Sequence, residues 1–225
     1  MDKATRSWKT TKTIFQLQGN IASGKSELLT ILQDKGISVA KEPLEEWAEL
    51  LKISEKEGGK DFSVHKQTRI LSSLSLRDSE TRQTLVSKDK VVMERDIVSS
   101  KEIFVPYATG NNRMDKEGEM TIRLLHKNLE NLRNLEDRNW EERNDCRLAR
   151  RAIYLRTPPE ECWGRIKQRG QVGDSHLTQE QISQLHTAHE TWVKNQNKNI
   201  FVINGDDDQM SIANQVMDEI NKRQR

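Results

Sequence analysis

The chain has 225 residues, a length that favours a single domain, and its 33% hydrophobic and 32% charged residues predict a modest core beneath a highly charged surface. Its 37 basic and 35 acidic side chains nearly cancel, so no global field indicates a nucleic-acid or membrane partner, and we expect neither. The two cysteines have neither metal-site spacing nor the count of a secreted disulfide framework, which favours a reducing compartment: the cytoplasm is expected, with mitochondria and the nucleus as alternatives.

Short runs rich in β-branched residues recur after a basic leader that we assign to residues 1–12 and expect to be flexible. They predict five strands, at residues 13–18, 37–43, 90–95, 152–156 and 199–205. Each run is mostly unbroken, as in strands that are buried on both faces of a parallel sheet. Helical periodicity between the runs implies right-handed crossovers, so residues 13–225 are predicted to form one α/β domain.

The stretch at residues 105–150 is polar at first and then dense in charge, and we predict a mobile connection that leads into one long helix. Apolar residues recur there at a three-four spacing, at Ile122, Leu125, Leu129 and Leu132. This stripe has two interpretations. It packs against its own domain, or it forms a helix–helix contact in a dimer.

A phosphate-binding loop is predicted between the first strand and a helix at residues 26–34. The pattern GxxxxGK[ST] is matched without a gap by Gly19, Asn20, Ile21, Ala22, Ser23, Gly24, Lys25 and Ser26. Lys25 is expected to reach the β- and γ-phosphates of ATP, and the Ser26 hydroxyl to bind Mg²⁺. Because no NKxD guanine-reading motif occurs, a GTPase is disfavoured.

Charged residues follow two further strands, where ligands of open α/β sheets bind. Glu42, which precedes a proline at the second strand end, can accept the proton of a substrate hydroxyl that attacks phosphorus. Glu94 can hold Mg²⁺, and Arg95 can bridge the acceptor and the transferred group. Salt-bridged surface residues are the alternative for all three.

Arg165 and Arg169 lie four residues apart, so on a helix they share one face. Arginines that project from a lid at about residues 163–174 would neutralise charge on the transferring phosphoryl group. The alternative is an ordinary solvated helix face.

Together these segments resemble the deoxynucleoside kinase family, which includes deoxycytidine, deoxyguanosine and mitochondrial-type thymidine kinases. The resemblance covers about residues 14–204 and runs through GNIASGKS, EPLEEW, QTRILSSL, ERDIVSSKEIF, YLRTPPEECWGRIKQRG and LHTAHETW. It implies ATP-dependent 5′-phosphorylation of a deoxynucleoside on a P-loop NTPase fold with a thymidylate-kinase-like, five-stranded parallel sheet and a lid. It also implies a homodimer, here through long helices near residues 119–136.

The resemblance implies a role for individual residues. Glu42 resembles the general base and Glu94 the Mg²⁺-linked carboxylate, while Arg95 resembles the arginine at the 5′ end. Arg165 and Arg169 then act on the donor phosphates. In the acceptor half, the residues implied to contact the base are Trp47 and Gln67.

Some positions depart from the family pattern. The segment SEKEGGKDFSVHK lacks the tyrosine that commonly holds the sugar 3′-hydroxyl, and a lid arginine is replaced by Gln171. The motif ERS reads ERD here, with Asp96, and the acidic lid residue at the 3′-hydroxyl is matched by Asp174. These changes make tolerance of 3′-modified analogues conceivable.

The acceptor expected from the resemblance is a pyrimidine deoxynucleoside, thymidine included, or a broad range. Members selective for deoxycytidine and purines carry an Asp and an Arg at places that correspond to Ser100 and Leu74. One alternative is a nucleoside monophosphate kinase such as thymidylate kinase, which would need extra cationic residues for the acceptor phosphate. Another is a catalytically silent family member that acts as a structural or regulatory subunit, although Lys25 and Glu42 are both present.

Overall fold

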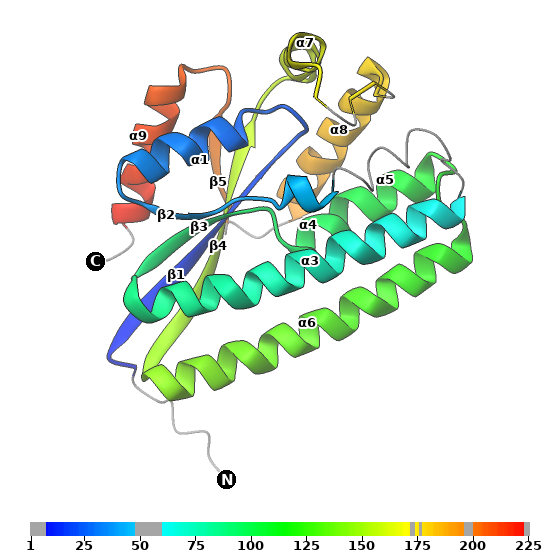
Figure 1. The fold of residues 1–225 in the computed structure, drawn as a ribbon. Helices are drawn as coiled ribbons and strands as arrows, with labels where there is room; N and C mark the ends of the chain where they lie inside the picture. Colours follow the sequence, from blue (N-terminus) through cyan, green and yellow to red (C-terminus); the bar gives the residue numbers. More distant parts are fainter. Residues whose placement is uncertain (1–7, 48–59, 172–173, 176, 196–199, 223–225) are drawn as a thin grey trace.

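The computed structural model describes residues 8–47, 60–171, 174–175, 177–195 and 200–222. Five parallel strands form one sheet in the order β2-β3-β1-β4-β5 (Figure 1). They are β1 (Thr10–Gly19), β2 (Ser38–Ala40), β3 (Lys90–Glu94), β4 (Cys146–Arg156) and β5 (Ile200–Asn204). The predicted five-stranded parallel α/β fold is confirmed, and all strands point their carboxyl ends toward the same edge.

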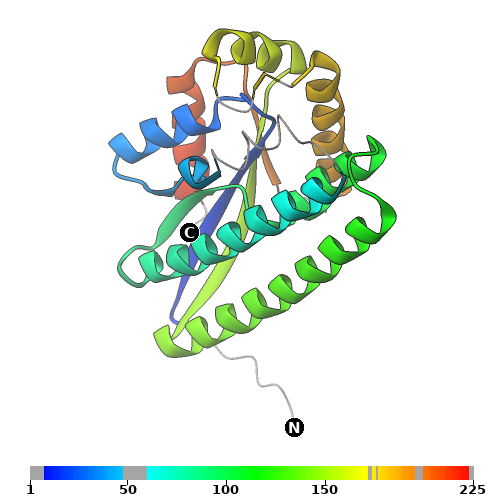
Figure 2. The same ribbon diagram turned by 45° about the vertical axis from the view of Figure 1, so that its right-hand side comes forward.

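Helices cover both faces of the sheet. One face packs on α1 (Lys25–Asp34) and α9 (Gln209–Lys222), with side chains such as Phe15, Leu29 and Val216 in a shared core. The other face packs on α3 (Lys60–Ser87) and α6 (Lys116–Asn144), which run side by side in both views (Figures 1 and 2). Alternate residues of β1 serve the two layers, because Ile14 joins the second core and Phe15 the first.

The carboxyl edge of the sheet carries the remaining helices. After β3 the chain forms α4 (Ile97–Ser99), the π-helix η1 (Ser100–Phe104) and α5 (Val105–Gly110) without a break. After β4 come α7 (Pro159–Arg169) and α8 (Gln179–Asn195), with α7 at the top of Figure 1. The predicted lid segment therefore begins within α7. Among the described residues, no helix is both long and apolar enough to cross a membrane.

Three sequence-based boundaries are corrected. Residues 10–12, assigned to the leader, are part of β1 and pair with the start of β4. The second strand has only three residues, and a helical turn at residues 44–47 follows Pro43. The charged region at 105–150 holds α5, α6 and the first half of β4, and the chain reverses at Asp145, whose φ of 51° is left-handed.

The apolar stripe on α6 fits the two interpretations, packing within the domain and contact in a dimer, each in part. Ile122 is buried, and Leu125 and Leu129 pack against the same core, so these residues serve their own domain. Leu132 is 47% exposed and faces solvent instead.

Buried charges join α3, α6 and β4. Arg150 Nη1 on β4 lies 2.6 Å from Asp78 Oδ1 on α3, and Arg150 Nη2 lies 2.8 Å from Asp137 Oδ1 on α6. Burial alone would raise the pKa of Asp78, but the ion pair and hydrogen bonds from Arg150 outweigh it, so the pKa of this carboxyl lies below its ordinary value. The carboxylates of Asp78 and Asp137 are therefore what make the cationic Arg150 acceptable inside the second layer.

Arg150→Ala is expected to lower the free energy of unfolding by about 1–3 kcal/mol at pH 7, because Asp78 and Asp137 lose one of their two arginine partners and keep only Arg82. The loss should show as a lower urea midpoint with an unchanged slope. Because the pKa of Asp78 is depressed, its contribution is present at neutral pH and disappears as the pH falls through its folded value, so the two proteins should converge in acid. Arg147→Ala, at an exposed position of the same strand, is the control, and an equal loss there would contradict this account.

Candidate active site

The phosphate loop has the geometry that its glycines predict. It joins β1 to α1, and Ala22 and Gly24 have φ values of 58° and 99°. A Cβ on Gly24 would lie 2.8 Å from Gln209 Nε2 and 3.4 Å from Arg165 Nη1. Glycine at this position is thus required both by the backbone angle and by the side chains that close over the loop.

Lys25 is held inside this loop. Its ammonium donates to the carbonyl oxygens of Gly19 at 3.1 Å and Asn20 at 2.8 Å, and the residue is 5% exposed. Burial, with a contribution from nearby Arg95, lowers the pKa of Lys25 to about 8. A buried cation at a helix N-terminus is a strong site for an anion, since the backbone N–H groups and the charge act together.

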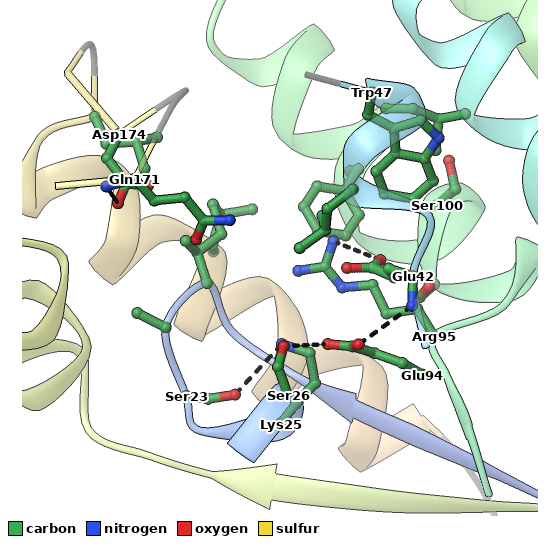
Figure 3. A pocket seen from close by; sticks show the side chains of 18 of the residues that line it. Ser23, Lys25, Ser26, Glu42, Trp47, Glu94, Arg95, Ser100, Gln171 and Asp174 are labelled. Carbon is green, nitrogen blue, oxygen red and sulfur yellow. Dashed lines mark hydrogen bonds and ion pairs between the residues drawn. The ribbon is translucent and has the colours of Figure 1, made fainter. Parts of the chain in front are cut away.

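Glu94 connects the loop to the second strand end (Figure 3). Its Oε1 accepts from the Ser26 hydroxyl at 3.3 Å, and its Oε2 accepts from the backbone N–H of Glu42 at 3.3 Å. The side chains of Ser26 and Glu94 thus place oxygen ligands next to the phosphate loop, which suits a hard cation such as Mg²⁺. Among the described residues no group of three or more His, Cys, Asp or Glu could hold a metal ion.

Glu42 and Arg95 face each other across the acceptor side of the site. Arg95 Nη1 lies 3.3 Å from Glu42 Oε1, and the Glu42 side chain is 5% exposed. Burial raises the pKa of Glu42 above its ordinary value, Arg95 opposes this and Glu94 adds to it. The backbone of Arg95 is left-handed, with φ of 52°, a conformation that costs a residue with a side chain roughly 1–2 kcal/mol. The site holds this strain at one of its charged residues.

A cavity of about 610 Å³ extends from the phosphate loop to the predicted base-binding residues. Trp47 is 6% exposed, and its Nε1 donates to Ser73 Oγ at 2.9 Å. Ser100 Oγ donates to Gln67 Oε1 at 3.0 Å, which leaves the Gln67 amide nitrogen for another acceptor. Leu74 lines the same wall. Figure 3 shows Trp47 and Ser100 on the side of Glu42.

The lid residues lie on the opposite wall of this cavity (Figure 3). Arg165 reaches the phosphate loop and also donates to the Gly205 carbonyl at 3.5 Å. Arg169 does not reach the loop in this way. It forms a two-point ion pair with Asp174, at 2.8 and 2.9 Å, and the Gln171 N–H donates to the same carboxylate at 3.2 Å. Arg169 and Asp174, which the sequence predicted to bind different parts of the substrates, therefore bind each other in this structure.

Asp96, the departure within the ERD motif, lies outside the cavity lining. Its carboxylate accepts from the Ser99 N–H at 3.2 Å and caps α4. It also accepts from the side-chain amides of Gln16 at 2.5 Å and Gln18 at 3.2 Å, and Arg133 lies 3.5 Å away. Burial raises the pKa of Asp96, and Arg133 opposes this shift. The aspartate therefore ties α4 to β1 of the sheet.

The cavity-lining residues that sequence reasoning missed include Lys66, Phe104, Tyr107 and Arg113. The Arg95 guanidinium carbon lies 4.7 Å from the Phe104 ring centroid, and that of Arg113 lies 5.9 Å from the Tyr107 ring. Phe104 ends the motif SSKEIF and could have been found from it. Tyr107 could not, because it comes from α5, far along the chain from the segment where a tyrosine was expected. That segment includes residues 54–59, which lie outside the described residues.

Comparison with known proteins gives a consistent result. A family model described as deoxynucleoside kinase matches residues 15–224. A probable deoxycytidine kinase of fowlpox virus (strain NVSL) is 28% identical over 209 residues, which are 88% of this chain and 81% of the relative. Human mitochondrial thymidine kinase 2 is 26% identical over 191 residues, 82% of this chain and 66% of the relative.

A solved structure has the same fold. It is deoxyadenosine kinase from M. mycoides with the products dCMP and a flexible dCDP bound, and it aligns with a TM-score of 0.72 over 93% of this chain and 99% of that chain. The sequence identity is 19%, so this likeness concerns the fold alone.

Lys25→Ala is expected to abolish detectable MgATP binding in isothermal titration calorimetry, since it removes the buried cation of the loop. The thermal midpoint without ligand should change little, because Lys25 is held by polar contacts rather than by core packing. Lys35→Ala, at the exposed end of the same helix, is the control and should bind MgATP normally. Normal binding by Lys25→Ala would contradict the assigned loop function.

Proposed function

Because the chain belongs to the deoxynucleoside kinase family, we propose that it transfers the γ-phosphoryl group of ATP to the 5′-hydroxyl of a deoxynucleoside, preferentially one with a pyrimidine base, thymidine included. The resemblance predicted from the ordered motifs is confirmed at the level of the family and of the enzyme class, a kinase. The observation that carries the proposed site is the juxtaposition of the phosphate loop and Glu42: Glu94 accepts from the Ser26 hydroxyl of the loop and from the backbone N–H of Glu42. One wall binds a phosphate donor and the other offers a base to an acceptor.

In the proposed step, the 5′-oxygen of the acceptor forms a bond to the γ-phosphorus as the bond from that phosphorus to the β–γ bridging oxygen breaks. Glu42 Oε takes the proton of the 5′-hydroxyl, and ADP leaves with the bridging oxygen. Arg95, already 3.3 Å from Glu42, is placed to hold the attacking oxygen and the transferred group together. Lys25 and Arg165 act on the charge that spreads over the phosphoryl oxygens.

Ser26 and Glu94 are the residues that would hold Mg²⁺. When bound, the cation neutralises charge on the β- and γ-phosphates. Its binding would replace the hydrogen bond between the two side chains, so both oxygens are already directed toward one point.

The lid arrangement supports a role in closing the site over bound ATP. Arg165 is already at the loop, whereas the Arg169–Asp174 pair must open before Arg169 can reach donor phosphates and Asp174 a sugar hydroxyl. Tyr107 offers a hydroxyl from the acceptor wall and is a further candidate for the sugar. Burial raises the pKa of Tyr107, which keeps the phenol protonated and able to donate.

The acceptor preference is supported by the wall around Gln67. Ser100 fixes one end of the Gln67 amide, and the apolar side chains of Leu74 and Ile70 line the cavity beside it. An amide with adjacent apolar surface can read a pyrimidine edge and tolerate a methyl group. The relatives carry the names of thymidine, deoxycytidine and deoxyadenosine kinases, so the comparison does not select among bases.

A second candidate function, thymidylate kinase, has one observation in its favour. Lys66 and Arg113 both line the cavity, and burial together with Arg113 lowers the pKa of Lys66. Two close cations are what a phosphorylated acceptor would require. The double variant Lys66→Gln/Arg113→Gln separates the two functions: it should leave nucleoside phosphorylation intact if the acceptor is a nucleoside, and abolish turnover if it is a nucleoside monophosphate.

Glu42→Gln is expected to lower kcat by about 10²–10⁴-fold, because it removes the general base while keeping the side-chain volume. The assay uses radiolabelled ATP with the four natural deoxynucleosides and thymidylate as acceptors. In the parent enzyme the acid limb of kcat/KM should lie above the range of an ordinary glutamate, because only ionised Glu42 accepts the proton and its pKa is raised. Glu46→Gln, at an exposed neighbouring position, is the control. Unchanged turnover in a folded Glu42→Gln enzyme would sink the assignment.

We also propose that a second copy of this chain covers the outer face of α6. Four apolar side chains line this face, with exposed fractions of 64%, 61%, 47% and 48%: Met120, Leu124, Leu132 and Leu135. They lie on a different side of the helix from buried Ile122, so the core does not use them. Exposed apolar stripes of this kind are typical of protein interfaces, and a dimer through long helices accords with the resemblance.

Leu124→Lys/Leu135→Lys is expected to convert a dimer into a monomer in sedimentation-velocity experiments, since two buried cations would oppose the contact. Met210→Lys, at a 50% exposed apolar position on α9, is the matched control and should stay dimeric. A parent protein that sediments as a monomer at all concentrations would remove the proposed contact.

A further inference from the structure

The turn at the end of β3 has to be held in place by something other than its own residues. Arg95 is left-handed, a conformation that glycine adopts freely and other residues resist. Glycine at this position would relieve the strain but would lack the side chain that contacts Glu42. The Arg95 N–H still pairs with the Leu17 carbonyl of β1 at 2.9 Å, so the sheet fixes only the entry to the turn.

Arg77, on α3, donates hydrogen bonds to the backbone of this turn. Its Nη2 donates to two consecutive carbonyl oxygens, that of Glu94 and, at 3.1 Å, that of Arg95. The residue is 7% exposed. Its Nε and Nη1 have no hydrogen-bond partner among the described residues, so these two carbonyls are the hydrogen bonds that the structure shows for this side chain.

A second buried arginine on the same helix serves a different purpose. Arg82 is 3% exposed, and its guanidinium pairs with three carboxylates, those of Asp78, Glu136 and Asp137. Those partners lie outside the active-site cavity and join α3 to α6. Arg82 is thus part of a charge network between layers, whereas Arg77 places its charge beside two carbonyls of the site.

We propose that Arg77 is a positioning residue for phosphoryl transfer: by binding two consecutive carbonyl groups it fixes the turn that directs Arg95 to Glu42 and Glu94 to Ser26. This inference rests on the roles proposed above for Glu42, Glu94 and Arg95. A side chain that touches neither substrate would then govern both the metal-linked carboxylate and the arginine at the acceptor, because their backbones share one support.

The experiment compares Arg77→Gln, Arg77→Lys and Arg82→Gln in the radiolabelled-ATP assay, with urea unfolding of each protein. Arg77→Gln is expected to lower kcat by about 10–100-fold through misplaced groups, with little change in KM for ATP. Arg77→Lys keeps a charged N–H donor at this position, so it should restore part of kcat. Arg82→Gln should lose as much stability or more, yet keep the parent kcat and KM at temperatures where it is folded.

A folded Arg77→Gln enzyme with the parent kcat would overturn the proposal, as would activity losses in both Gln variants that follow only the unfolded fraction. If Arg77→Gln does not fold, Arg77→Lys decides the matter. An ammonium lacks the planar fork of arginine, so its kcat should lie about 3–10-fold below that of the parent, and equality overturns the proposal. Active Glu42→Gln and Lys25→Ala enzymes would instead refute the proposed function itself, whatever Arg77 does.

Discussion

The carboxylate of Glu94 is the contact on which the site depends. One of its oxygens binds the Ser26 hydroxyl of the phosphate loop, and the other binds the N–H of Glu42 on the neighbouring strand end. Without this bridge, the donor and acceptor walls would meet only through the sheet beneath them. Because β3 lies between β1 and β2, Glu94 at the end of β3 can reach both.

The sheet order explains why a strained turn stands at the centre. The chain leaves β3 directly between the two walls and must present Glu94 to both and Arg95 to Glu42 within two residues. Regular strand geometry would point successive side chains to opposite faces. The left-handed angle at Arg95 breaks this alternation, and the Asp96 cap starts α4 immediately afterwards. Backbone strain and the proposed function of Arg95 therefore coincide at one position.

The parts of the site that could be predicted are local in sequence or follow from parallel topology. The phosphate loop is contiguous, and Glu42 and Glu94 follow strands whose ends must share an edge. The contact of Arg77 with the β3 turn could not be predicted, because it joins a long helix to a later strand through backbone carbonyls. The Arg169–Asp174 ion pair could not be predicted for another reason. Each of these charged side chains can bind a substrate group or the other side chain, and the sequence does not distinguish the two.

The missed first half of β4 shows how this chain builds a core with few hydrophobic residues. The charge-dense sequence up to Arg150 is predicted to be part of one long helix, yet Arg150 lies in a strand and pairs with Asp78 and Asp137. Arg82 and the contact of Arg133 with Asp96 extend the same principle between α3, α6 and the carboxyl edge. Each ion pair crosses between elements, so opposite charges substitute for apolar contacts at the layer boundary. A charged side chain can therefore be buried when an oppositely charged side chain pairs with it. The sequence alone does not say which charged residues pair.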